Sequence, residues 1–163
     1  MIEHIQINLN KHVNPEAVLS RQENGLQPAL YINPSYLKEV CLFLRDTEGY
    51  YFDFLADLAA VDYFPEPYFE VVYHLTSMPY QKQLVLKVKL DNERQADDIP
   101  SLSSVSDIWR TADWHEREAF DLMGIYFEGH PDLRRILMPD DWEGYPLRKD
   151  YQDPEYYHGI TVK

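Results

Sequence analysis

The fold is indicated most clearly by residues 69–90, which read FEVVYHLTSMPYQKQLVLKVKL. Large apolar residues fall at every second position in both halves of this stretch: Phe69, Val71, Tyr73, Leu75, then Leu84, Leu86, Val88 and Leu90. A period of two places these side chains on one face of a β-strand. Because Met78-Pro79 interrupts the pattern at a turn-like spacing, we predict two neighbouring antiparallel strands.

The residues before this stretch extend the sheet. Residues 51–61 are aromatic and aliphatic, and Pro65-Glu66-Pro67 separates them from the strand that follows. Three consecutive strands joined by short connections predict an antiparallel meander.

A helix is predicted upstream, opened by Asn33-Pro34 and stopped by Gly49. Its apolar residues, at spacings of three and four, are Leu37, Val40, Cys41 and Leu44. Cys41 is therefore expected in the core. The helix would cover one face of the meander, which gives an α+β fold of two layers with a mainly antiparallel or mixed sheet.

Weaker signals predict three further helices and a loop. Asn14-Pro15-Glu16 resembles a helix start, with an end near Asn24-Gly25. Pro100-Ser101 would open a short helix carrying Leu102, Val105 and Trp109, after a polar loop at 91–100. Asp113 would cap the last helix, with Glu116 as its capping-box partner and Gly124 at its end.

The sequence changes character after residue 123. Residues 124–163 are rich in glycine, proline and aromatic residues, and no helical period is visible among them. So many aromatic residues are atypical of a disordered tail. We therefore divide the chain into a compact α+β domain at 1–123 and an extended arm at 124–163. The arm either wraps its own domain or lies over another subunit. The many aromatic residues favour the second arrangement, because such residues are typical of protein interfaces.

Composition excludes several classes of protein. The formal net charge is −13, and no basic patch is visible, so nucleic-acid binding and adsorption to anionic lipid are not expected. The one cysteine cannot supply the four ligands that an iron–sulfur cluster normally needs. No nucleotide loop or hydrolase elbow occurs. The most apolar stretch, 52–64, contains three aspartates, so direct membrane insertion is not expected either.

A metal site is the main catalytic alternative. His115, Glu118 and His130 could together bind an ion, which would make the chain a stand-alone metalloenzyme. The zinc-protease helix needs a second histidine four residues after the first, and position 119 is alanine. Two ligands one turn apart do not by themselves make a site.

The region from 112 to 160 contains a dense set of charged, glycine and aromatic residues at fixed spacings. Its members are Glu116, Arg117, Glu118, Asp121, Gly124, Gly129, His130, Pro131, Arg134, Arg135, Trp142, Arg148 and Lys149. Arg117 and Asp121 are spaced for an ion pair along a helix. His130, Arg134 and Arg135 would present hydrogen-bond donors to a partner.

This spacing resembles the signature of the family of C subunits of respiratory NADH–quinone oxidoreductase (complex I). The runs Ala112-Asp113-Trp114-His115, Trp142 to Tyr151 and Tyr157-His158-Gly159-Ile160 are also similar to the family. Two positions depart from it: Tyr145, where many relatives carry His, and Met123, where Phe or Tyr is common.

The resemblance implies a peripheral subunit of a hetero-oligomer, with no catalytic residue and no cofactor of its own. Flavin mononucleotide and iron–sulfur clusters would belong to other subunits. Its partners would be the D subunit, which helps to form the quinone site, and other subunits of the hydrophilic arm. The location implied is the cytoplasmic face of the cell membrane. Membrane-bound hydrogenases and ferredoxin- or coenzyme F420-dependent quinone oxidoreductases have a related small subunit, so the electron donor stays open.

Overall fold

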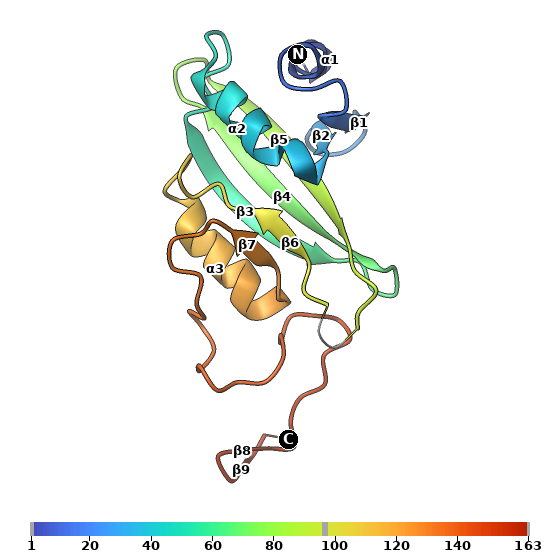
Figure 1. Cartoon of the computed structure of the whole chain (residues 1–163), viewed down its shortest axis with the longest axis vertical. Coiled ribbons are helices and arrows are strands. Elements are labelled where there is room, and N and C mark those ends of the chain that lie inside the picture. The colour runs from blue at the N-terminus through green and yellow to red at the C-terminus, as the bar shows by residue number, and fades with distance from the viewer. Residues whose placement is uncertain (1, 96–97, 163) are drawn as a thin grey trace.

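The protein is an α+β fold built on one mixed sheet, as expected. The computed structural model describes residues 2–95 and 98–162. The sheet has five strands in the order β1-β2-β5-β4-β3. Figure 1 shows α2 lying across one face of this sheet and α3 beside β3. The side chains on the helical face form the core, so the fold has two layers.

The predicted meander is confirmed. β3 (Phe54–Asp62), β4 (Tyr68–Ser77) and β5 (Lys82–Asp91) pair antiparallel, with Val71 of β4 between Ala60 and Val88. The apolar residues at every second position of β4 and β5 are buried in the core. Period-two alternation therefore identified the strands and the face that packs against the helices.

The first two strands were not predicted. β1 (Val18–Gln22) pairs antiparallel with β2 (Ala29–Ile32), and β2 pairs parallel with β5. The helix expected to start at Asn14-Pro15-Glu16 is wrong. The Asn14 side chain accepts a hydrogen bond from the Glu16 amide at 2.9 Å and so closes a turn that leads into β1. A short polar turn of this kind looks the same in sequence as a helix cap.

The N-terminal segment forms a helix that was also missed. α1 (Ile2–His12) buries Ile2, Ile5 and Leu9 and packs beside β1 and β2. The remaining positions of the helix are mostly polar. Its apolar stripe is therefore narrow, and the periodicity is weak.

The central helix forms as predicted. A short 3-10 turn, η1 (Pro34–Tyr36), is capped by the Asn33 side chain, and α2 (Leu37–Asp46) follows it. The four residues of the predicted stripe are fully buried, and this confirms Cys41 as a core residue. The helix ends before the expected glycine.

The helix expected at 100–109 is wrong. Residues Ser101–Ser103 form β6, which pairs parallel with β7 (Tyr126–Glu128), Leu102 lying opposite Phe127. Leu102 and Trp109 are nevertheless buried, and the Trp109 indole donates to the carbonyl of Phe52 at 2.9 Å. A strand followed by a turn can bury the same residues as a helix. In the expected loop at 91–100, residues 96–97 lie outside the described part, and Asp91 ends β5.

The last helix, α3 (Ala112–Met123), leads into β7 and then into irregular structure. The core continues beyond residue 123, because Ile125 and Phe127 are buried. Residues 129–155 form turns and irregular structure, and a small hairpin of β8 (Tyr156–Tyr157) and β9 (Ile160–Thr161) projects at the end (Figure 1). The division at 123/124 and the packing of the arm on a partner stay predictions.

Candidate partner-docking site

Helix α3 carries three charged residues of the signature, Glu116, Arg117 and Asp121, at buried positions, whereas Glu118 is exposed. Ala112, Glu116, Ala119 and Met123 are buried, at spacings of four, three and four. Gly124 ends the helix in the left-handed conformation, with φ of 68°. The signature thus begins inside the core and leaves it at a sharp turn.

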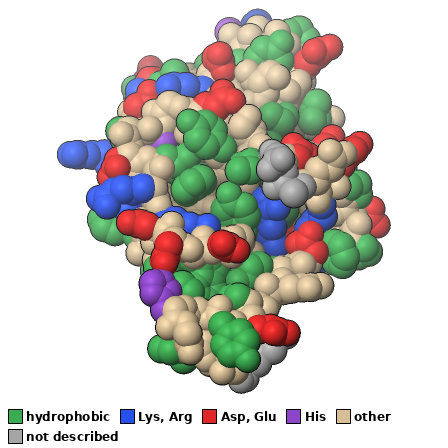
Figure 2. All heavy atoms as spheres, turned by 60° about the horizontal axis from the view of Figure 1, so that its bottom comes forward, with side chains coloured by type: hydrophobic (Ala, Val, Ile, Leu, Met, Phe, Trp, Pro, Cys, Tyr) green, Lys and Arg blue, Asp and Glu red, His purple; other side chains and the backbone are tan. Residues whose placement is uncertain are grey.

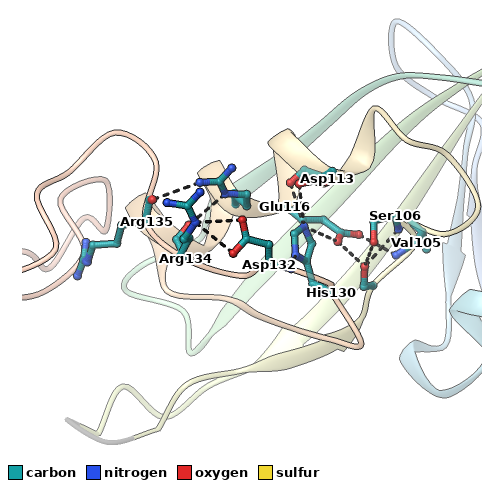
Figure 3. Close-up of polar contacts among 10 residues, drawn as sticks. Val105, Ser106, Asp113, Glu116, His130, Asp132, Arg134 and Arg135 are labelled. Atoms are coloured by element: carbon teal, nitrogen blue, oxygen red, sulfur yellow. Dashed lines mark hydrogen bonds and ion pairs between the residues drawn. The ribbon is translucent and has the colours of Figure 1, made fainter.

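Glu116 is a buried acid rather than a helix cap. The α3 helix begins at Ala112 and Thr111 makes no capping side-chain bond, so the predicted capping box is wrong. The Glu116 carboxyl accepts hydrogen bonds from the Ser104 hydroxyl at 2.6 Å and the Val105 amide at 2.8 Å (Figure 3). Burial raises its pKa from 4.5 to about 7, although these two hydrogen bonds oppose the rise. The carboxyl therefore fastens the loop after β6 to the helix.

His130 turns inward onto the same helix. Its side chain is fully buried, and Nε2 lies 3.1 Å from the carbonyl of Asp113 and 3.9 Å from the Glu116 carboxyl. Nδ1 accepts from the Asp132 amide at 3.0 Å, so the hydrogen bonds assign the ring proton to Nε2. Figure 3 shows the imidazole between Asp113 and Glu116. In this structure His130 therefore binds its own chain instead of presenting a donor outward.

Asp121 organises the first loop of the arm. One of its carboxylate oxygens accepts from three consecutive backbone amides, those of residues 136–138, at 2.7–3.0 Å. The other accepts from Arg135 at 2.8 Å. Burial raises the pKa of Asp121, but these donors outweigh it and the net direction is downward. Asp121 is therefore a buried, ionised anchor.

The predicted ion pair between Arg117 and Asp121 is wrong. Arg117 instead donates to the carbonyls of Arg134 and Arg135, at 3.3 and 3.5 Å, and its guanidinium lies 5.2 Å from the Trp114 ring. The loop supplies both the donors for Asp121 and the acceptors for Arg117, and helical spacing alone cannot reveal this. Arg134 lies on the surface and pairs with Asp132.

Arg148 anchors the second loop of the arm at the C-terminal end of α3. It donates to the carbonyls of Met123 and Gly124, at 2.7 and 3.2 Å, and satisfies acceptors that the helix end leaves open. Its guanidinium packs between the rings of Phe69 and Tyr145, and burial lowers its pKa. A Cβ at Gly124 would lie 2.5 Å from the Tyr145 ring. Glycine is therefore required by both the turn and the packing.

Asp62 and Arg94, which the sequence did not single out, complete this anchoring. Asp62, at the end of β3, pairs with Arg94 and accepts from the Lys149 amide at 2.8 Å. Farther along, the Trp142 indole donates to the Tyr151 hydroxyl at 3.0 Å. The two partners of Asp62 lie 32 and 87 residues away along the chain, so no local pattern could have found them.

Large apolar side chains of the same region remain on the surface. We define the apolar strip as Trp114, Leu137 and Leu147, which are 62%, 62% and 57% exposed. Two hollows of about 130 and 160 Å³ lie along it, and His115 and Glu118 line both. Figure 2 shows hydrophobic side chains gathered between the C-terminal hairpin and the body of the protein, with charged side chains around them. Such a surface suits a protein partner.

The structure does not bring the three candidate metal ligands together. His115 lies 3.3 Å from Asp57, whereas His130 contacts Asp113 and Glu116. Within residues 2–95 and 98–162, no group of three metal-binding side chains is found. The same residues form no helix long and apolar enough to cross a membrane.

Comparison with known families gives a consistent result. The family described as respiratory-chain NADH dehydrogenase, 30 Kd subunit, matches residues 30–157. The C subunit of the NADH-quinone oxidoreductase of Chloroherpeton thalassium is 46% identical over 149 residues, which are 90% of this chain and 60% of that protein. The C subunit of the Roseiflexus sp. enzyme is 47% identical over 137 residues, 83% of this chain and 76% of that protein.

Solved structures agree with the sequence relatives. A trypsin-resistant fragment of Nqo5, residues 1–134, is 30% identical, with a TM-score of 0.62 over 79% of this chain and 99% of the fragment. A chain of an archaeal membrane-bound sulfane sulfur reductase is 24% identical, with a TM-score of 0.72 over 93% of this chain and 85% of that one. The second likeness shows a shared fold.

Proposed function

The chain belongs to the respiratory-chain NADH dehydrogenase 30 Kd subunit family, and from this membership we propose that it is a non-catalytic scaffold subunit of an NADH–quinone oxidoreductase. In this proposal residues 124–163 and the apolar strip dock on the D subunit, the subunit that helps to form the quinone site. The assembly would lie at the cytoplasmic face of the membrane.

One observation carries the docking proposal. The backbone amides of residues 136–138 are bound by Asp121, and Arg148 is bound to the end of α3, whereas Leu137 and Leu147 beside these anchors stay more than half exposed. Fixing a loop costs conformational entropy. A loop held rigidly with its apolar side chains outward is preorganised for a partner, because little further ordering is needed on binding.

The same contacts support a scaffold role. Glu116, Asp121 and Arg148 each hold a loop in place, and the one cysteine is buried. We therefore expect no flavin, iron–sulfur cluster or catalytic metal in this chain. Visible spectroscopy and elemental analysis of the purified chain test this expectation. A flavin, iron or zinc retained at one per chain after dialysis would overturn it.

Docking is tested by placing a charge on the apolar strip. Leu137→Asp and Leu147→Asp are expected to weaken binding to the purified D subunit at least tenfold. Burying a leucine side chain contributes about 1.5–3 kcal/mol, and the carboxylate adds a desolvation cost. Titration calorimetry gives the affinities, and circular dichroism checks that each variant stays folded.

Leu19→Asp is the matched control. Leu19 is 60% exposed on β1, so it has a similar exposure but lies outside the strip. Unchanged binding of both strip variants would refute docking through the strip. If Leu19→Asp weakened binding equally, the added charge would be acting without regard to its position. That result would also refute docking through the strip.

A further inference from the structure

A second surface feature lies at the opposite end of the protein from the C-terminal hairpin. It is a cavity of about 730 Å³ between α1, the turn that follows α2 and the start of β5. Figure 1 places α1 at one end of the molecule and the hairpin at the other. The anchors of the arm contribute nothing to its wall. The cavity is therefore separate from the docking site described above.

The wall of this cavity is largely apolar and aromatic. Phe43 and Tyr50 lie on the α2 side, and the His12 ring of α1 stacks on Phe43 at 5.8 Å with an interplanar angle of 16°. Asn8 donates to the Tyr50 hydroxyl at 2.6 Å and lies 3.1 Å from Nδ1 of His4. These contacts connect α1 to the turn that follows α2. Between them they leave a recess whose walls include the flat rings of His12, Phe43 and Tyr50. Such a recess suits an apolar or aromatic side chain.

The recess is less acidic than the chain as a whole. Its wall carries one lysine, Lys82, and one acid, Glu48, beside the imidazoles of His4 and His12, whereas the whole chain has a net charge of −13 with its histidines neutral. Among the described residues, no ion pair is formed by Lys82 or His12. The Lys82 ammonium lies 5.3 Å from the Tyr80 ring. This arrangement leaves cationic and hydrogen-bonding capacity that a carboxylate would complement.

We propose that this recess is a docking site for a peptide segment of another subunit, which inserts an apolar or aromatic side chain and places an adjacent Asp or Glu against Lys82. The chain belongs to a family of subunits, and the recess lies far from the apolar strip. The segment would therefore come from a subunit other than the one at the strip, and this chain would join two partners. The inference does not depend on whether the D subunit occupies the strip.

Site-specific photo-cross-linking in the intact, purified NADH–quinone oxidoreductase tests the proposal. p-Benzoylphenylalanine replaces Glu48, which is exposed on the rim of the recess. A second preparation carries it at Leu147 on the strip. Mass spectrometry identifies the attached peptides. We expect the Glu48 position to attach to a segment with an acid beside an apolar residue, on a different subunit from the one that Leu147 reaches.

Charge reversal at the rim supplies the control. Lys82 is exposed, so Lys82→Glu leaves the core intact. It should reduce the cross-link yield from position 48 at least tenfold and leave the yield from position 147 unchanged, whereas Lys82→Arg should preserve both. Both charge changes are compared in complexes that contain the same set of subunits.

Several outcomes would overturn the proposal. One is that no peptide is attached at position 48 in a complex where position 147 cross-links. Another is that the cross-link yield from position 48 is unchanged by Lys82→Glu. A third is that both positions attach to the same subunit. A small-molecule adduct at position 48 would also overturn it, in favour of a ligand site. Cross-linking at 48 but not at 147 would support the recess and count against docking at the strip.

Discussion

Replacing Glu116 by Gln is expected to remove most of a pH dependence from the stability of this fold. The carboxyl is fully buried, and its pKa in the folded protein is about 7 against an ordinary 4.5. A raised pKa means that folding favours the protonated form. The associated stability is fully present below pH 4.5 and is lost as the pH rises through 7.

The magnitude follows from the two pKa values. Each pH unit between them corresponds to about 1.4 kcal/mol, so the whole effect is about 3 kcal/mol. Between pH 5 and pH 8 the free energy of unfolding should fall by roughly 2–3 kcal/mol from this group. For a chain of this size that is a fall of about 5–10 °C in Tm.

Glutamine reproduces the hydrogen bonds of the protonated acid. Its carbonyl can accept from the Val105 amide, and its NH2 group can donate to the Ser104 hydroxyl, which also lies 2.8 Å from Ser106. Urea unfolding at pH 5, 6, 7 and 8 compares wild type, Glu116→Gln and Glu118→Gln. Glu118 is exposed on the same helix, so its variant should keep the wild-type profile.

The difference between the profiles of wild type and Glu116→Gln isolates this carboxyl from the other titrating groups. Parallel profiles for these two proteins would refute the reasoning, because the buried acid would then be ionised at no cost.

Three further predictions concern the anchors of the arm. Asp121→Ala should lower the free energy of unfolding by about 3–5 kcal/mol because it leaves buried donors unpaired, whereas surface Asp132→Ala should cost under about 1 kcal/mol in the same urea titration. Gly124→Ala should lower Tm more than Gly129→Ala: both have positive φ, but only at Gly124 would a Cβ meet a side chain. Arg135→Ala, which removes bonds to Asp121 and to the carbonyl of Gly144, should make the arm more sensitive to limited proteolysis than Arg134→Ala does. Equal sensitivity of these last two variants would contradict the anchor assigned to Arg135.

The sequence by itself determined the centre of the fold. The strands β4 and β5 and helix α2 have strong periodic patterns, because each buries one complete face of its own residues. β3 was predicted from its aromatic and aliphatic content and from the prolines that follow it. The sequence also predicted the end of α3 at Gly124, because the left-handed backbone conformation that ends a helix favours glycine. The family resemblance also rested on sequence spacing alone, and the family match at residues 30–157 confirms it.

The tertiary structure alone decided the pairings between distant segments. β1 looked like a helix because its Asn-Pro start fits both structures, and pairing with β2 settles which one forms. β6 likewise exists as a strand through its parallel pairing with β7, 25 residues later. Short strands have little preference of their own, so their long-range partners determine them.

The roles of the charged signature residues were decided in the same way. Spacing along α3 predicted a cap at Glu116 and a pair between Arg117 and Asp121. The fold instead brings the loop after β6 and residues 130–138 against the helix. A buried charge takes the nearest donors that desolvation leaves available, wherever they lie in the chain. The sequence could therefore identify which residues matter, and only the folded chain could show what each of them holds.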